Sequence, residues 1–288
     1  MKPPAFTYHR PRSIDEALAV LAELGDRGKV LAGGQSLVPL MSMRLSAPEH
    51  LVDVNHVPGL GTVEVDATAV RVGASARHSE VEQHPAAYDA APLLRQALQH
   101  VAHPTIRNRG TTVGSLVHGD PAAEMPAVLC LLDGSVTVRT ADASREVAAS
   151  EFFTGPMETA VRPGELAVAA TFRRPPGGTG SAFVEVARRH GDYAVCGVGA
   201  VVTVSDGEVS AARVALVSMG TGPVLVDVGA AAADGAGWDD TLVAELVDAA
   251  TDPEGDIHAS ADYRRHLSHV LARRALDQAS AGAGRSAA

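Results

Sequence analysis

Two adjacent glycines, Gly33 and Gly34, interrupt an apolar run and are followed by Gln35 and Ser36. Glycine has no Cβ, so it can take positive φ and lets another group approach the main chain closely. The amides that open the next segment then point outward together, an arrangement that suits a phosphate. A third glycine at Rossmann spacing is missing, and a Gly-Gly pair alone is more typical of an ordinary turn. The stretch predicts a strand, a tight turn and a short helix, with the turn as a candidate phosphate site.

A second glycine-containing stretch covers residues 106–124 and reads Ile-Arg-Asn-Arg-Gly-Thr-Thr-Val-Gly-Ser-Leu-Val-His-Gly-Asp-Pro-Ala-Ala-Glu. Two such loops in one chain can hold the two phosphates of a dinucleotide from opposite sides. The main chain of this stretch offers amides, and three hydroxyls add further donors: Ser36, Thr111 and Ser115. Because neutral donors suffice, no lysine or arginine is required at the phosphates. We expect the bends near residues 34 and 114 to face each other.

Composition and charge exclude several other classes of function. The chain has 288 residues, of which 46% are hydrophobic, so it can bury a sizeable core. A net charge of −10 without a basic block argues against a nucleic-acid partner. No apolar run has the length of a membrane span, and the amino terminus has no apolar segment of signal-peptide type. We therefore expect a cytoplasmic protein without a membrane span.

The metal-ligating residue types are too scattered to form a centre of their own. Cys130 and Cys196 lie far apart without Cys-x-x-Cys spacing, so the chain alone cannot hold an iron–sulfur cluster with four thiolates. The histidine pairs His100/His103 and His266/His269 lack a nearby third ligand, and we expect no zinc site. If electrons reach this chain from a metal centre, that centre belongs to another chain.

The elements before the first stretch form a small α/β unit. Ser13 and Glu16 make a capping box, and apolar residues at helical spacing predict a helix that ends at Gly25. Strands are expected at 29–32 and 51–54, with a short helix near 37–43 between them. The unit spans residues 1–57 and presents the first turn.

A middle unit of residues 58–175 presents the second stretch. Its expected strands are 69–73, 136–139 and 166–172, and Asp120-Pro121 is a plausible cap and first turn for a helix that runs to about residue 132. Residues 173–180 are rich in proline and glycine, which indicates a linker. Beyond it, residues 180–279 predict three strands (183–187, 194–204, 209–218) and two helices (241–249, 260–278), and the tail 280–288 is expected to be disordered.

Several motifs together resemble one known family. These are Ala32-Gly-Gly-Gln-Ser36, Ile106-Arg-Asn-Arg-Gly-Thr111, Gly114-Ser115, Asp120-Pro-Ala-Ala-Glu124, Arg188-Arg-His-Gly-Asp-Tyr-Ala194 and Tyr263-Arg-Arg-His-Leu. They are similar to the flavin-binding medium subunit of molybdenum hydroxylases of the aerobic carbon monoxide dehydrogenase and xanthine dehydrogenase type. The resemblance covers nearly the whole chain. It implies an α+β fold: a two-part FAD-binding domain of the vanillyl-alcohol-oxidase/p-cresol-methylhydroxylase type and a C-terminal α+β domain with a three-stranded antiparallel sheet and helices.

The resemblance also implies which residues contact FAD. Tyr193 would lie beside the flavin ring, Leu166 would meet the adenine end through its backbone, and an acidic side chain would accept hydrogen bonds from ribose hydroxyls. The full expected set is Ala32, Gly33, Gly34, Gln35, Ser36, Thr111, Thr112, Val113, Gly114, Ser115, Asp120, Glu124, Leu166 and Tyr193.

Some of these residues have simpler explanations. Glu124 can instead stabilise the positive end of its own helix, and Tyr193 can be a tyrosine at the start of a strand with its hydroxyl in solvent. Arg107 and Arg109 fit phosphate clamps or ion pairs with acidic side chains.

Val113 stands where the family has a glycine. A β-branched residue resists positive φ, so either it points into the core and the backbone shape is kept, or FAD binding is weakened. We favour the first interpretation, because the neighbouring residues match the family.

The implied function is electron transfer within a complex. The partners would be a large molybdenum-cofactor subunit and a small [2Fe-2S] subunit in a heterohexamer of two trimers, and the electron acceptor would be a quinone or NAD. Two alternatives stay open: a flavoprotein that oxidises a small molecule alone, and a scaffold that has kept the fold without the cofactor. The substrate of the complex cannot be derived from this chain.

Overall fold

The N-terminal unit is a small parallel sheet with two helices. The computed structural model describes residues 2–233 and 237–286. Strands β1 (Thr7–His9), β3 (His50–Asp53) and β2 (Gly28–Leu31) pair in parallel in the order β1-β3-β2. Helix α1 (Ile14–Leu24) packs on β3, the 3₁₀ turn η1 (Gly25–Arg27) follows α1, helix α2 (Leu37–Ser42) follows β2, and the 3₁₀ turn η2 (Val54–His56) follows β3.

The predicted helix cap at Ser13 is confirmed. The Ser13 hydroxyl accepts from the Glu16 amide at 3.1 Å. The Glu16 carboxylate accepts from the Arg12 amide at 2.7 Å, one residue earlier than a capping box requires. The prediction was therefore right about where α1 begins and wrong about one of the two bonds.

The middle unit is a five-stranded antiparallel sheet covered by short helices. The strands are β4 (Val63–Val65), β5 (Ala69–Gly73), β10 (Leu166–Arg173), β6 (Ser135–Arg139) and β7 (Ser144–Ala148), in that order across the sheet. The helices are α3 (His78–Gln83), α4 (Pro85–Ala90), α5 (Pro92–Leu98), α6 (Pro104–Arg107), α7 (Thr112–His118), α8 (Glu124–Leu131) and α9 (Ala149–Phe152). A small hairpin, β8 (Phe153–Gly155) with β9 (Glu158–Thr159), follows α9.

The C-terminal sheet has one strand more than the sequence predicts. Strands β11 (Thr179–Ala187), β12 (Ala194–Ser205), β13 (Glu208–Val217) and β14 (Val224–Asp227) form an antiparallel sheet in chain order. The fourth strand was not predicted from the sequence because β14 is only four residues long. Its pairing with β13 holds it in the sheet. The 3₁₀ turn η3 (Gly229–Ala231), the short strands β15 (Ala232–Ala233) and β16 (Gly237–Trp238) and helices α10 (Asp240–Ala250) and α11 (Ala261–Ser286) complete the unit.

Helix α11 continues beyond the end that the sequence predicts. It reaches Ser286, so the tail expected to be disordered is helical over residues 280–286, while residues 287–288 lie outside the described part. Ala279 and Ala283 are fully buried, and a Cβ on Gly180 of β11 would collide with the backbone of both. Small residues on both elements thus bring helix and strand into close contact, and this packing extends the helix.

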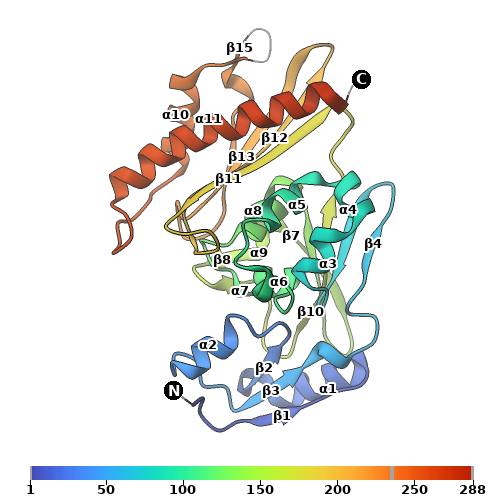
Figure 1. The fold of residues 1–288 in the computed structure, drawn as a ribbon. Helices are drawn as coiled ribbons and strands as arrows, with labels where there is room; N and C mark the ends of the chain where they lie inside the picture. The colour runs from blue at the N-terminus through green and yellow to red at the C-terminus, as the bar shows by residue number, and fades with distance from the viewer. Residues whose placement is uncertain (1, 234–236, 287–288) are drawn as a thin grey trace.

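The C-terminal sheet lies between two layers of helices (Figure 1). One face packs on α5 and α8 of the middle unit, and the other is crossed by α11. The first hydrophobic core joins the N-terminal unit, the middle unit and the inner face of this sheet, whereas the second lies between the sheet and α10 and α11. Arg213 of β13 makes a bidentate ion pair with Asp133, at 2.7 and 2.8 Å, across the junction.

Candidate functional site

The two glycines of the first turn are required for different physical reasons. Gly34 has φ 71°, in the left-handed region that favours glycine. Gly33 does not need positive φ, but a Cβ there would lie 2.6 Å from the Arg109 carbonyl oxygen and 2.7 Å from the Gly110 Cα. The expectation of positive φ thus holds for Gly34. At Gly33, the absence of a Cβ allows the segment around Arg109 and Gly110 to pack against the main chain. We call residues 32–36 the glycine turn.

The glycine turn leaves its main-chain donors free. Among the residues that the structure describes, the amides of residues 33–36 donate no hydrogen bond to the protein. The Gln35 side chain donates to the Gly33 carbonyl at 3.1 Å and so stiffens the turn. Unpaired amides grouped in one tight turn form a concave donor surface that suits an anion.

The second stretch is the start of a helix and not a free loop. Thr111 caps α7: its hydroxyl accepts from the Gly114 amide at 3.1 Å, and its carbonyl accepts from the Ser115 amide at 3.0 Å. The amides of Gly114 and Ser115 are therefore already bonded within the helix, contrary to the expectation that this main chain is open. A Cβ on Gly114 would collide with the Thr111 hydroxyl, so glycine at this position protects the cap. We call residues 109–115 the second segment.

Val113 and Thr112 point into the protein interior. Val113 is 2% exposed and belongs to the first hydrophobic core, which confirms the interpretation that it packs inward with the backbone shape kept. Positive φ is not needed there, because the residue is helical. Thr112 is fully buried, and its hydroxyl lies 3.2 Å from Nδ1 of His78. Burial lowers the pKa of His78 to about 4, so its imidazole is neutral beneath the second segment.

The glycine turn and the second segment lie in direct contact. Gly33 packs against the peptide between Arg109 and Gly110, so closely that a Cβ on Gly33 would collide with this peptide. In Figure 1 the blue N-terminal unit lies directly below the green helices α6 and α7. The glycine turn thus meets the second segment at residues 109–111, ahead of residue 114.

The start of α8 differs from the prediction. Asp120 is not its N-cap: the Asp120 carboxylate accepts from the Ala122 amide at 2.9 Å, in a turn that precedes the helix. The helix begins at Glu124, so this residue lies at the first helical position and not one turn in. An aspartate before a proline is compatible with a cap and with such a turn, and the tertiary structure selects the turn.

Glu124 is a buried acid that keeps its proton at neutral pH. It is 7% exposed, and burial, together with the charges of Glu185 and Asp120, raises its pKa to about 8. Glu185 extends from β11, and one of its carboxylate oxygens lies 3.6 Å from Nδ1 of His100. A protonated carboxyl stabilises a helix end less than a carboxylate does.

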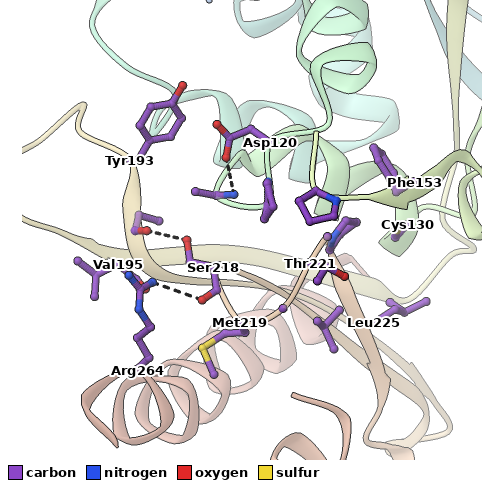
Figure 2. A pocket seen from close by; sticks show the side chains of 18 of the residues that line it. Asp120, Cys130, Phe153, Tyr193, Val195, Ser218, Met219, Thr221, Leu225 and Arg264 are labelled. Carbon is purple, nitrogen blue, oxygen red and sulfur yellow. Dashed lines mark hydrogen bonds between the residues drawn. The ribbon is translucent and has the colours of Figure 1, made fainter. Parts of the chain in front are cut away.

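Tyr193 brings the C-terminal unit to the glycine turn. Its hydroxyl lies near the side chains of Ser36 and Asp120. Its pKa is raised by partial withdrawal from water and by the negative charges of Asp120 and Glu124. The residue as a whole is 63% exposed, so much of its side chain is accessible. Figure 2 shows Tyr193 and Asp120 side by side at one end of a cavity.

Leu166 and Arg107 are built into the protein framework. Leu166 is the first residue of β10, 2% exposed and part of the core beneath α7. Arg107 donates to the Glu82 carboxylate at 2.8 Å and to the carbonyls of Val101 and Ala102, which confirms its interpretation as an ion pair. Arg109 is exposed.

A cavity of about 1650 Å³ lies between the middle unit and the edge of the C-terminal sheet. Its lining includes Asp120 and Tyr193 at one end and the turn between β13 and β14 at the other (Figure 2), but neither the glycine turn nor residues 109–115. The free amides of the glycine turn therefore lie outside this cavity.

The structure also brings in two residues that the sequence did not single out. Asn55 and Arg77 lie between the glycine turn and the second segment. Asn55 follows β3. Ligand-binding sites often lie at the carboxyl ends of parallel strands, so this rule could have indicated Asn55. No sequence signal marks Arg77.

Metal and membrane features are absent from the described residues. No group of three histidine, cysteine, aspartate or glutamate side chains within residues 2–233 and 237–286 could hold a metal ion. None of the helices in this part of the chain combines the length and hydropathy needed to cross a bilayer.

Two family models together match most of the chain. The model described as "FAD binding domain in molybdopterin dehydrogenase" matches residues 4–172, and "CO dehydrogenase flavoprotein C-terminal domain" matches residues 181–279. The 6-hydroxypseudooxynicotine dehydrogenase complex subunit alpha of Paenarthrobacter nicotinovorans is 38% identical over 97% of this chain and 96% of that protein.

Carbon monoxide dehydrogenases give the same result. The medium chain of the enzyme from Afipia carboxidovorans is 35% identical over 98% of this chain and 99% of that protein. The solved structure of the Hydrogenophaga pseudoflava enzyme that lacks the Mo-pyranopterin moiety matches with a TM-score of 0.92, at 34% identity, over 98% of this chain and 99% of that chain. The α+β fold class is confirmed. The chain belongs to the FAD-binding medium subunits of molybdenum hydroxylases of the carbon monoxide dehydrogenase type, a family of oxidoreductase subunits with FAD as cofactor.

Proposed function

We propose that this chain holds the FAD diphosphate between the glycine turn and the second segment, and that it works as the electron-transfer subunit of a molybdenum hydroxylase complex. The observation that carries the proposal is the direct contact of Gly33 with the Arg109–Gly110 peptide, beside a turn whose amides have no partner. This geometry fits a diphosphate because amide donors in a low-dielectric turn bind anions without a cationic side chain.

The individual residues then take different parts. The amides of residues 33–36 and the Ser36 hydroxyl supply most donors, and the Thr111 hydroxyl adds one from the other side. Asp120 is partly exposed, so it suits hydroxyl groups of the cofactor better than Glu124, which is buried and protonated. Tyr193 offers an accessible side chain for the flavin, and Leu166 supports the adenine end through the backbone of β10.

The partners are inferred from chemistry and from the names of the relatives. Two cysteines cannot bind an iron–sulfur cluster alone, and both are free and buried, so the metal centres belong to other subunits. Bound FAD lets the chain accept single electrons from [2Fe-2S] clusters on a small subunit and release pairs to a quinone or NAD. A large subunit would carry the molybdenum cofactor, in a cytoplasmic heterohexamer of two trimers.

The proposal is tested by flavin retention in Gly34→Val. Valine at φ 71° is strained, and its side chain would press on Leu31 and Val38 at 3.2 and 3.3 Å, so the turn must change shape. We expect the purified variant to lose its flavin absorption while the thermal unfolding transition of the C-terminal unit persists. The matched control is Gly177→Val, where nothing lies within 4 Å and φ is not positive. A Gly34→Val chain that stays fully yellow contradicts the assignment.

The subunit role is tested with the same wild-type chain. Isolated and loaded with FAD, it is expected to show no bleaching by organic substrates until the large and small subunits are added. Bleaching by the chain alone supports the stand-alone oxidoreductase, and a wild-type chain that binds no FAD supports the cofactor-free scaffold.

A further inference from the structure

A polar network ties the glycine turn to the second segment and is not used by the proposed contacts to FAD. Its side chains are Asp53, Asn55 and Arg77, and its backbone acceptors are the carbonyls of Ala32 and Arg109. The network crosses from the N-terminal unit to the middle unit.

Arg77 forms the half of the network that lies on the middle unit. Its Nη1 donates to the Arg109 carbonyl at 2.6 Å, and its Nη2 donates to Oδ1 of Asn55 at 2.7 Å. Arg77 precedes α3 and forms an antiparallel bridge with Thr111, and the next amide, of His78, donates to the Gly110 carbonyl at 2.9 Å. The guanidinium is thereby held alongside the second segment.

Asn55 forms the half that lies on the N-terminal unit. Its Nδ2 donates to the Ala32 carbonyl at 2.8 Å and to the Asp53 carboxylate at 2.5 Å. The Tyr8 hydroxyl bonds to the other oxygen of that carboxylate, which fixes its orientation. Because β2 and β3 are parallel neighbours, Asn55 at the end of β3 lies beside the residue that opens the glycine turn.

The two halves act on the same contact. The Arg109 carbonyl that accepts from Arg77 is the group against which Gly33 packs. We infer that Arg77 and Asn55 form a latch that fixes the separation of the glycine turn and the second segment, so that the diphosphate site is preformed in the free chain. This inference rests on the proposed function, and it makes Arg77 and Asn55 positioning residues for FAD.

Preorganisation explains why such a latch raises affinity. A gap that is already set needs no ordering when the cofactor binds, so less of the binding free energy is lost. Hydrogen bonds with a charged partner are among the stronger ones in proteins, so loss of the set gap is expected to weaken FAD binding by about tenfold or more.

The test is a flavin-fluorescence titration of full-length variants. Arg77→Ala removes both guanidinium bonds. Asn55→Asp keeps an oxygen that can accept from Arg77. It replaces the amide that donates to the Ala32 carbonyl with a second oxygen, so that hydrogen bond is lost. Both are expected to bind FAD at least about tenfold more weakly than wild type. The control is Arg10→Ala, which removes an exposed cation from the N-terminal unit. It is expected to bind FAD like wild type.

Chemical rescue separates a latch from a general loss of structure. Guanidinium ion added at concentrations below its denaturing range is expected to restore part of the FAD affinity of Arg77→Ala and to leave Asn55→Asp unchanged. Hydrogen exchange at residues 109–112 of the free variants is expected to be faster than in wild type, because the amides of Arg109, Gly110 and Thr112 are hydrogen-bonded there. If Arg77→Ala does not fold, Asn55→Asp decides the question.

The outcomes distinguish the latch from the proposed function. If wild type binds FAD and either variant binds it within about twofold of wild type, the latch is overturned while the diphosphate site stands. If Arg77→Lys keeps full affinity and binding weakens steeply with salt, Arg77 is a direct phosphate ligand and the latch is again overturned. If wild type binds no FAD, the proposed function fails instead.

Discussion

The buried carboxyl of Glu124 makes the stability of this chain depend on pH in an unusual direction. Its folded pKa, about 8, lies above the ordinary value of 4.5 because of burial first and the charge of Glu185 second. Between these values the folded chain holds a proton that the unfolded chain has lost. Stability is therefore highest below the lower value and falls as pH rises through the window, the reverse of an ion-paired carboxylate.

Glu124→Gln tests this dependence, because glutamine resembles the protonated acid and cannot ionise. Between about pH 5 and pH 8 we expect the free energy of unfolding of wild type to drop by about 1–3 kcal/mol relative to the variant. Urea unfolding of the FAD-free chains at several pH values measures the difference. Glu23→Gln, at an exposed position of α1, is the control. Parallel pH profiles for wild type and Glu124→Gln would show that the carboxyl is ionised in the folded chain.

At the scale of single elements, the start of α7 depends on one hydroxyl. Thr111 is its only side-chain cap among the described residues, and the Gly114 amide has no other acceptor there. Thr111→Ala should therefore lower the free energy of unfolding by about 1 kcal/mol, whereas Thr111→Ser keeps the hydroxyl and should cost much less. Chemical denaturation of both variants measures the cap. Equal stability of the two variants would mean that the cap contributes nothing.

Caps and apolar spacing predicted a helix end correctly only where no distant contact determines that end. Ser13 gave the start of α1 correctly, because a cap and the apolar spacing of its helix lie within a dozen residues. Asp120 misled, since its carboxylate closes a turn before α8. The extension of α11 depends on the contact of Ala279 and Ala283 with Gly180, about a hundred residues away, and no local pattern reports it.

At the scale of the whole molecule, the site is made by contacts between units. The sequence predicted both glycine stretches, and the family resemblance brought in Tyr193. It could not show that Tyr193 lies near both Asp120 and Ser36. Asn55 and Arg77 were missed because each is an ordinary polar residue until the fold brings Asn55 to the Ala32 carbonyl and Arg77 to the Arg109 carbonyl. The separation of units thus follows from the sequence, and their meeting follows only from the tertiary structure.

The central claim is that main-chain amides at the meeting point of the first two units hold the diphosphate. A crystal structure of the full-length chain grown with FAD tests it most directly. The account predicts diphosphate oxygens within hydrogen-bond distance of the amides of residues 33–36 and beside Thr111, with the flavin ring at Tyr193. A diphosphate bound by arginine side chains in the cavity between Asp133 and Leu225, with the glycine turn left uncovered, would contradict it.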